Sequence, residues 1–254
     1  ARGFKGSDHE SAHDHIVDDR GGIYLTGAFT GTVNFDPSST SHKMTAGSND
    51  MFVAKHDSNG SHVWSFQLGW GKYETKTVLE LDNFGKLWLG GGFNRLIDFD
   101  HGPGTAEFGN WEYRNKNSFF AAYNPNNGAY YQKAMTFHPR IVNSDWAQFM
   151  KHDSKGNLLL ISKISGIVDF DPDTAQSRYL SGKGVSWNYV ITKYDSLGKH
   201  VWSSSIKCGR INYVTHLTID DSDNIYIAGE TRDSVDIDPS SNTLWVYDGG
   251  YVVK

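Results

Sequence analysis

The sequence of 254 residues has a single cysteine, no long apolar run and no excess of positive charge. Cys208 has no second cysteine to pair with, so an internal disulfide and a cysteine-built zinc site are excluded. No run of about 18 apolar residues occurs, so we expect no insertion into a membrane. The formal net charge of −5 offers no basic surface, so nucleic acid is not an expected partner.

The sequence also lacks the short motifs that mark common active sites. It has no G-x-S-x-G, no H-E-x-x-H, no Walker loop and no dinucleotide fingerprint. Its 29 acidic residues are too numerous for a pair of catalytic carboxylates to be singled out. No catalytic residue is therefore predicted.

Glycine and aromatic residues, in contrast, are plentiful, with 27 glycines and an aromatic content of 14%. This composition is typical of many tight turns that join aromatic-rich strands. No window of about 11 residues carries apolar residues at the helical period of 3.6. The sequence therefore predicts an all-β protein.

One unit of about 60 to 70 residues occurs four times, which is the signature of a repeat architecture. Each copy has a turn rich in Asp, Gly and Asn, then a strand such as Ile23–Phe29, and then a segment such as Thr32–Pro37 (TVNFDP). A third strand such as Met51–His56, a second tight turn and a fourth strand through Trp64 follow. The aspartates that start the first turn are Asp18, Asp82, Asp153 and Asp220, and those before or near the proline are Asp36, Asp100, Asp171 and Asp238.

Four antiparallel strands at this period predict a β-propeller of about four blades. We expect residues 1–12 to end a preceding blade, 13–68, 76–135 and 147–206 to be complete blades, and 214–254 to be a truncated one. A β-sandwich is the competing fold, but it gives no reason for a fourfold repeat. Because both chain ends fall inside expected strands, we expect the chain to be continuous with further blades or domains; a closed four-blade ring is the alternative.

The repeat resembles a known family. The pattern G-x-I-Y-x-x-G-x-x-x-G-x-V-x-F-D-P, followed by N-D-x-F-V-A-K-x-D-S-x-G-x-x-V-W, is similar to the β-propeller repeats named for seven-bladed propellers, in the form common in secreted and surface proteins of Bacteroidetes. The resemblance implies an extracellular propeller, often one module of a protein exported by the type IX system, with no catalytic residues. Three positions depart from the pattern: Tyr131 for the tryptophan, Asn124 for the aspartate and Ser162 for the glycine.

A second, weaker resemblance concerns the string from Ala54 to Trp64. It is similar to the tryptophan-docking repeats of quinoprotein dehydrogenases, which hold pyrroloquinoline quinone and calcium. Those enzymes commonly carry two adjacent cysteines at the cofactor, and this chain has Cys208 alone. We therefore expect no cofactor of this kind.

Two groups of residues are candidate metal ligands. The four repeated aspartates Asp36, Asp100, Asp171 and Asp238 suit calcium, although an Asp beside Pro is first of all a turn former, and we favour that role. His9, His13 and His15 form the densest group of transition-metal ligands, and on a regular strand His13 and His15 share a face. A solvated polar segment is the favoured interpretation of this group, and the other histidines are scattered.

The connections that vary in length between the copies are expected to lie on one face of a propeller. They are rich in aromatic residues and arginine, the side chains that binding surfaces use, although some of these residues are expected to pack on neighbouring blades or in inserted hairpins. The candidate ligand-binding residues are Trp70, Tyr73, Trp111, Tyr113, Arg114, His138, Arg140, Trp146, Trp187, Arg210 and Trp245.

These observations predict a non-enzymatic scaffold of a secreted or cell-surface protein. Its loop face presents a binding surface to a glycan or a surface protein, in adhesion or surface assembly. A propeller hydrolase or lyase, with its active site at the centre of the loop face, is the alternative, and a purely structural spacer is a third possibility. No cofactor is expected, with calcium as the exception at the repeated aspartates.

Overall fold

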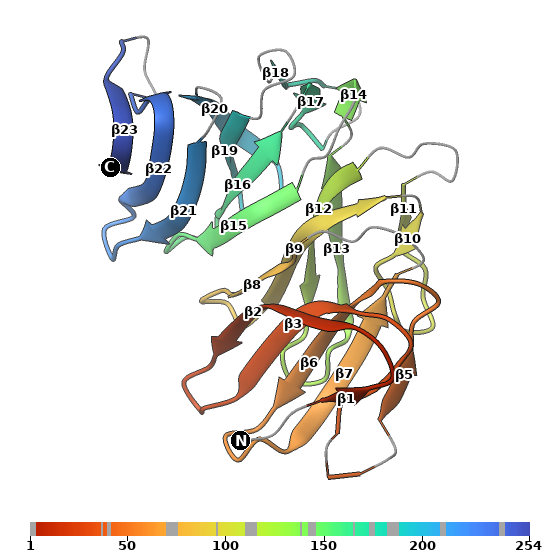
Figure 1. Cartoon of the computed structure of the whole chain (residues 1–254). Helices are drawn as coiled ribbons and strands as arrows, with labels where there is room; N and C mark the ends of the chain where they lie inside the picture. The colour runs from red at the N-terminus through yellow and green to blue at the C-terminus, as the bar shows by residue number, and fades with distance from the viewer. Residues whose placement is uncertain are drawn as a thin grey trace. The chain divides into compact units, whose positions relative to one another are not determined.

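A computed structural model shows the fold of the chain, which divides into two compact units, Ala1–Thr136 (unit 1) and Phe137–Lys254 (unit 2) (Figure 1). All regular structure in the described residues is β-strand, so no helix that could cross a membrane occurs among them. The structure describes residues 4–36, 38–39, 42–69, 76–94, 96–109, 116–137, 139–141, 146–164, 166–172, 176–181, 188–208, 212–238 and 242–254.

Unit 1 contains the first two sequence repeats, each folded as an antiparallel sheet of four strands. The strand order is β2-β3-β6-β7 in repeat 1 and β13-β12-β9-β8 in repeat 2, so each strand pairs with the next of the same four along the chain. The strands of repeat 1 are β2 (Glu10–Val17), β3 (Ile23–Phe29), β6 (Asp50–His56) and β7 (His62–Leu68), and those of repeat 2 are β8 (Val78–Leu81), β9 (Leu87–Asn94), β12 (Lys116–Tyr123) and β13 (Tyr130–Phe137).

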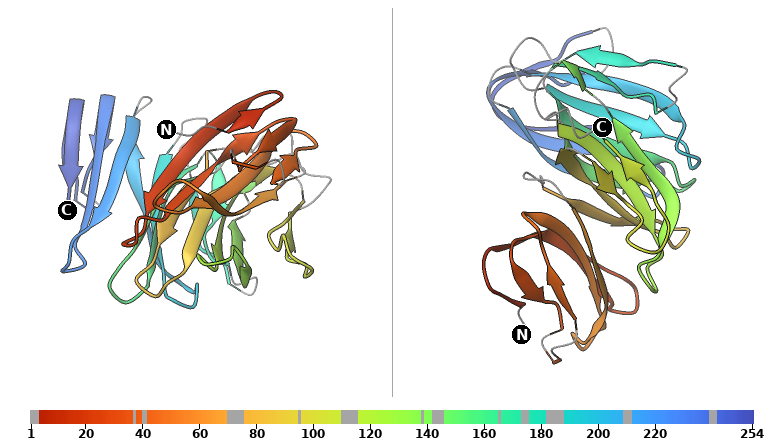
Figure 2. Two further views of the ribbon diagram at one scale, coloured as in Figure 1. Left: turned by 90° about the horizontal axis from the view of Figure 1, so that it is seen from below. Right: turned by 90° about the vertical axis from the view of Figure 1, so that its right-hand side faces the viewer.

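Unit 2 contains repeats 3 and 4 in the same antiparallel arrangement. The end of β20 pairs with the end of β22, so the two repeats share one seven-stranded sheet. Figure 2 shows β21, β22 and β23 running side by side. The strands of repeat 3 are β15 (Trp146–His152), β16 (Leu158–Ile164), β19 (Asn188–Tyr194) and β20 (His200–Cys208), and those of repeat 4 are β21 (Asn212–Ile219), β22 (Ile225–Asp236) and β23 (Trp245–Val253).

Each repeat has one feature beyond the four predicted strands, a small hairpin that begins at the F-D-P segment. In repeats 1 to 3 the second strand of this hairpin lies in the variable connection after the segment, where the sequence predicts no strand. In repeat 4 the last residues of β22 pair with the first residues of β23 to make this hairpin. The others are β4 (Thr32–Asn34) with β5 (Lys43–Thr45), β10 (Ile97–Asp98) with β11 (Glu107–Phe108), and β17 (Ile167–Asp169) with β18 (Tyr179–Ser181); β1 (Lys5–Gly6) and β14 (Pro139–Ile141) add a third strand to the first and last of these.

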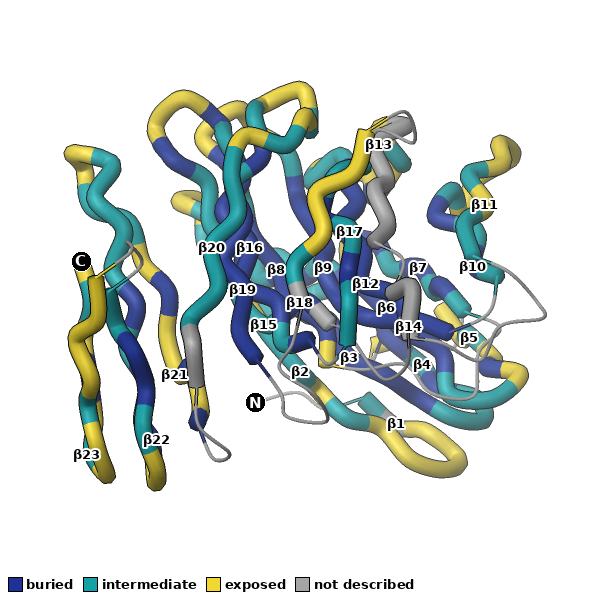
Figure 3. Tube along the Cα trace, turned by 90° about the horizontal axis from the view of Figure 1, so that it is seen from above, coloured by how far each residue is buried: buried dark blue, intermediate teal, exposed yellow. Residues whose placement is uncertain are grey.

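The core of each unit is built from the central strands of its sheets. β6, β9 and β16 are buried along nearly their whole length, and Figure 3 shows these strands in the buried colour. The phenylalanine of the F-D-P segment is almost fully buried in repeats 1 to 3, as Phe35, Phe99 and Phe170. Burial of one such aromatic side chain contributes about 2 to 3 kcal/mol, so this position anchors the hairpins of repeats 1 to 3 to their sheets.

A β-bulge interrupts the first strand of repeats 1, 3 and 4 at the same place, between Ala12 and Asp14, Ala147 and Phe149, and Val214 and His216. The residue opposite it is Gly27, Ser162 or Gly229. A Cβ atom on Gly27 would overlap the carbonyl oxygen of Ser11 and lie 2.8 Å from the ring of Phe52. Repeat 3 has Ser162 at this position, opposite Val190 instead of a phenylalanine.

The expected equivalence of Tyr131 with the strand tryptophans is wrong. The turn of repeat 1 closes with Asp57 N–H donating to Ser61 O, whereas the turn of repeat 2 closes with Asn124 N–H donating to Ala129 O and so has one more residue. Tyr131 consequently lies one position earlier in its strand. It is exposed like Val63 and Val201, not buried like Trp64.

The aspartate that starts the first turn of each repeat makes the same hydrogen bonds in all four copies. Its Oδ1 accepts the backbone N–H groups two and four residues later, at 2.7 to 3.0 Å. Its Oδ2 accepts from a side chain, such as Trp88 Nε1 on Asp82 at 2.8 Å or Lys193 Nζ on Asp153 at 2.7 Å. Hydrogen bonds from Asn224 lower the pKa of Asp220 to about 2.

Replacing Gly27 with Ala will destabilise unit 1, because the new methyl group has no space between Ser11 and Phe52. We expect the free energy of unfolding to fall by about 1 to 3 kcal/mol, measured by urea denaturation. Gly47→Ala is the matched control, since a Cβ atom there meets nothing within 4 Å. Equal stability of the two variants would show that repeat 1 does not have this close packing.

The lowered pKa of Asp220 predicts a specific loss of stability in acid. The folded-state pKa of about 2 lies below the ordinary value of 3.8, so the carboxylate stabilises the fold fully above about pH 4 and loses this effect as the pH falls toward 2. Asp220→Asn, followed by thermal unfolding at each pH, will therefore flatten the pH dependence of stability in this window. Asp221→Asn, at the exposed neighbouring position, will leave it unchanged.

Candidate functional site

The hairpin after each F-D-P segment has a constant hydrogen-bonded frame. In repeats 2, 3 and 4 the first aspartate of the segment accepts two backbone N–H groups on its Oδ1, at 2.7 to 3.2 Å. One comes from two residues later and the other from the residue just before the far strand of the hairpin. These aspartates are Asp98, Asp169 and Asp236, and Asn34 accepts the first of the two bonds in repeat 1.

A second constant feature fixes the hairpin to its sheet. The phenolic oxygen of Tyr123 donates to the carbonyl of Phe99 at 3.1 Å, and that of Tyr194 donates to the carbonyl of Phe170 at 2.9 Å. Burial raises the pKa of both phenols well above 10.0, so both remain protonated donors. In repeat 1 a histidine, His56, takes the place of the tyrosine, and its Nε2 lies 3.2 Å from the carbonyl of Phe35.

The exposed positions on this constant frame differ from repeat to repeat. The residue that pairs with the first Asp or Asn of the segment opens the far strand of the hairpin and faces solvent. It is Lys43, Glu107, Tyr179 or Trp245 in repeats 1 to 4. The hairpins therefore hold a cationic, an anionic or an aromatic side chain on the same rigid support.

Repeat 4 places two aromatic rings together at this position. Trp245 is 43% exposed and Tyr247 is 67% exposed, and their ring centroids lie 6.4 Å apart at an angle of 30°. Both residues lie at the start of β23, where the strand pairs with the end of β22. Two neighbouring exposed rings on a hydrogen-bonded hairpin form a surface suited to stacking against a flat apolar face.

The hairpin of repeat 1 brings together three metal-ligating side chains. Asp36, His42 and His62 each place one ligand atom within 4.8 Å of the others, and in the described part of the chain no other such group of three occurs. Hydrogen bonds from Ser38 lower the pKa of Asp36. Burial lowers the pKa of His62, with a further contribution from His42 and His56.

Asp36 is thus the one repeated aspartate that lies in such a group. Asp100 accepts the N–H of Gly102 at 2.9 Å, as expected of a turn former. Asp171 and Asp238 donate their own N–H groups to Asp169 and Asp236. None of these three comes together with two further ligands among the described residues.

The predicted histidine group is divided by the β-bulge of β2. The bulge turns both His13 and Asp14 toward β8, where His13 Nδ1 lies 3.1 Å from Thr77 Oγ1 and Asp14 Oδ2 accepts the N–H of Leu79 at 2.9 Å. The expectation that His13 and His15 share a face is therefore wrong. His9 and His15 are exposed, and His13 links the two repeats of unit 1.

Most of the predicted ligand-binding residues fall outside the described residues. Arg140 and Trp146 lie in β14 and β15, but the structure does not describe their side chains. Trp245 is exposed on its hairpin, as the binding prediction requires. The residues outside the description are Trp70, Tyr73, Trp111, Tyr113, Arg114, His138, Trp187 and Arg210.

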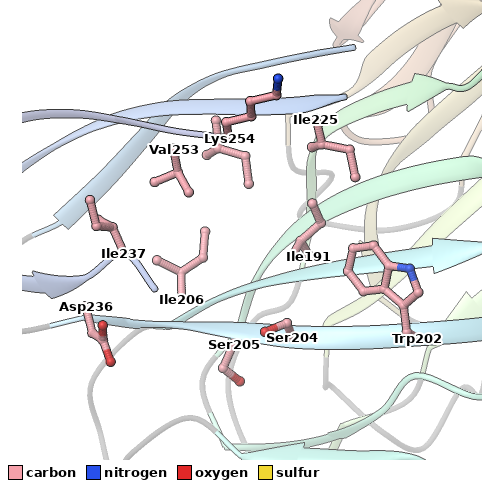
Figure 4. A pocket seen from close by; sticks show the side chains of 11 residues that line it. Ile191, Trp202, Ser204, Ser205, Ile206, Ile225, Asp236, Ile237, Val253 and Lys254 are labelled. Atoms are coloured by element: carbon pink, nitrogen blue, oxygen red, sulfur yellow. The ribbon is translucent and has the colours of Figure 1, made fainter. Parts of the chain in front are cut away.

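An apolar pocket lies between repeats 3 and 4 (Figure 4). In unit 1 the corresponding face of β7 is covered, because Trp64 Nε1 donates to the carbonyl of Pro125 at 3.2 Å and Phe66 stacks on His101. In unit 2 the equivalent face of β20 lines the pocket instead. The apolar lining residues are Ile191, Trp202, Ile206, Ile225, Ile227 and Val253.

His42 and His62 were not singled out from the sequence, although a signal was present. The hairpin and the β6–β7 turn bring them to Asp36 from positions that are far apart along the chain. Repeats 2, 3 and 4 have Ala106, Arg178 and Leu244 at the position of His42. The backbone of this position has the same role in every repeat, whereas its side chain differs, so a histidine found there in one copy alone marks a candidate functional residue.

The chain was also compared with known proteins. No protein-family model matches the sequence. No curated protein matches it either.

The hydrogen bond from Tyr194 predicts how strongly the hairpin of repeat 3 depends on its sheet. Tyr194→Phe removes the donor and leaves the carbonyl of Phe170 buried without its partner. We expect the free energy of unfolding to fall by about 1 to 2 kcal/mol. Tyr247→Phe, at an exposed position, will change it by less than about 0.5 kcal/mol. Denaturant unfolding of both variants measures the difference, and an unchanged Tyr194→Phe variant would contradict this role.

Proposed function

We propose that the chain is a set of β-propeller blades from a secreted or cell-surface protein, and that it acts without catalysis as a rigid scaffold presenting a binding face to a glycan or a protein partner. The observation that carries the proposal is the hairpin of each repeat. Its frame is constant, whereas its exposed residue is Lys43, Glu107, Tyr179 or Trp245. Such a division between frame and surface suits a binding module.

The propeller interpretation is supported by how consecutive repeats meet within a unit. The first strands of two consecutive repeats are neighbours, β2 beside β8 in unit 1 and β15 beside β21 in unit 2. In unit 1 hydrogen bonds join the two strands, from His13 to Thr77 just before β8 and from Leu79 of β8 to Asp14. Side-by-side first strands are what adjacent blades around a central channel require.

A glycan is the favoured partner because of the aromatic pair in repeat 4. Sugar rings have apolar C–H faces, and aromatic rings with a polar edge stack against them with little loss of side-chain entropy. Trp245 and Tyr247 are exposed side by side on a strand, so they need no rearrangement to bind. The secreted location rests on the resemblance to surface propeller repeats, and a single cysteine is compatible with it.

The binding test uses the chain itself on an array of defined oligosaccharides and polysaccharides. We expect at least one glycan class to bind, and the double variant Trp245→Ala, Tyr247→Ala to weaken that binding at least about tenfold, or about 1.4 kcal/mol. Val201→Ala is the matched control, since it removes an exposed apolar side chain from β20. The melting temperature of all variants will stay close to that of the wild type.

Two results would contradict the proposal. If binding is equally strong in the double variant and the control, the aromatic pair is not the site. If the array shows cleaved glycans instead of bound ones, the chain is a hydrolase or lyase and the non-enzymatic function is wrong.

A further inference from the structure

We propose that Asp36, His42 and His62 form a binding site for a divalent transition-metal ion such as Zn²⁺ in repeat 1. The donor set, two imidazoles and one carboxylate, is the set that zinc prefers when thiolates are absent. Three protein ligands leave coordination positions for water or for a side chain of a partner. This inference is independent of the proposed glycan binding, because the two sites lie in different units.

The distances between the ligand atoms suit a tetrahedral ion. His42 Nδ1 lies 3.4 Å from Asp36 Oδ2, and all three ligand atoms lie within 4.8 Å of one another. Ligand bonds of about 2.0 to 2.1 Å place the ligand atoms of a tetrahedral site about 3.4 Å apart. The first pair already has this separation. The separations that involve His62 are at most 4.8 Å, so they need to shorten only moderately when an ion binds.

Neighbouring groups hold the ligands in a suitable orientation. Asp36 Oδ1 accepts both the N–H and the hydroxyl of Ser38, at 2.9 and 2.6 Å, and Oδ2 is then directed at His42. His62 Nε2 lies 3.0 Å from Ser65 Oγ, which leaves its other ring nitrogen for the ion. Asp36 and His62 are thus each held on one side by a neighbouring group, which is how proteins orient metal ligands.

Three imidazole rings of repeat 1 lie close together. The rings of His42 and His62 have centroids 4.1 Å apart, and His56 lies 5.7 Å from His62. His56 is buried, its Nε2 faces the carbonyl of Phe35, and its Nδ1 has no hydrogen-bond partner among the described residues.

Repeat 3 supplies an internal comparison that separates architecture from metal binding. It has the aspartate and the second histidine, as Asp171 and His200, and His200 Nε2 contacts Ser203 Oγ at 2.8 Å just as His62 contacts Ser65. At the position of His42 it has Arg178, whose carbonyl accepts the N–H of Phe170 as that of His42 accepts the N–H of Phe35. A guanidinium group is a permanent cation and does not bind metal ions. His42 is therefore the residue that makes repeat 1 a site.

Zinc binding to the metal-free chain tests the proposal. After dialysis against a chelator, isothermal titration with Zn²⁺ is expected to show one equivalent bound with micromolar or tighter affinity. His42→Ala and His62→Gln will each weaken it at least about tenfold, and neither will lower the melting temperature of the metal-free chain by more than the matched control His200→Gln. That control will leave zinc binding unchanged. Spectra with Co²⁺ in place of zinc will show the intense visible absorption of a tetrahedral site.

Arg178→His gives a second, independent readout, since it places the missing ligand beside Asp171 and His200. We expect this variant to bind a second equivalent of Zn²⁺. The proposal is overturned if the wild type binds no zinc at micromolar concentration. It is also overturned if His42→Ala and His200→Gln weaken binding equally, because the ion would then be held at exposed histidines in general. Neither result bears on glycan binding, which the Trp245 and Tyr247 variants test separately.

Discussion

Every repeat depends on one interaction, in which a side-chain oxygen of Asp or Asn accepts the backbone N–H groups of its own turn. The first turns use Asp18, Asp82, Asp153 and Asp220, and the small hairpins use Asp98, Asp169 and Asp236. Each bond satisfies a backbone donor that no strand partner would reach. Because this chemistry is local, each repeat can form the same turns and hairpin from its own sequence.

The constant frame leaves the outer positions of each hairpin available for function. Stability comes from the buried phenylalanine, from its capped carbonyl and from the turn carboxylates, none of which needs a particular residue on the exposed side. Repeat 4 carries Trp245 and Tyr247 there. Repeat 1 instead carries His42, which combines with Asp36 and His62, both of which have counterparts in repeat 3. The residues that the repeats share thus stabilise the fold, whereas the exposed residues that differ from repeat to repeat are available for function.

The strands and turns could be predicted from the sequence because their signals are local and occur four times. The bulge in β2 could not, since an extra residue in a strand shifts the alternation of faces without a local sequence signal, and here it places His13 and His15 on different faces. The strand position of Tyr131 could not be predicted either, because the turn before it has one more residue than that of repeat 1 and no local sequence signal marks the insertion. In the group around Asp36, the aspartate could be predicted because it recurs in every repeat. His42 and His62 could not, because only the folded hairpin brings them to it.

Hydrogen–deuterium exchange measured by NMR at the hairpin amides tests the central claim, that a rigid frame supports variable exposed residues. The N–H groups of Ala106, Arg178 and Leu244 donate to buried or half-buried aspartates at 2.8, 2.7 and 2.9 Å. We expect these amides to exchange as slowly as those of the central strands β9, β16 and β22. Exchange at the rate of an unstructured peptide would contradict the account, because the hairpins would then be mobile loops and not a support for binding residues.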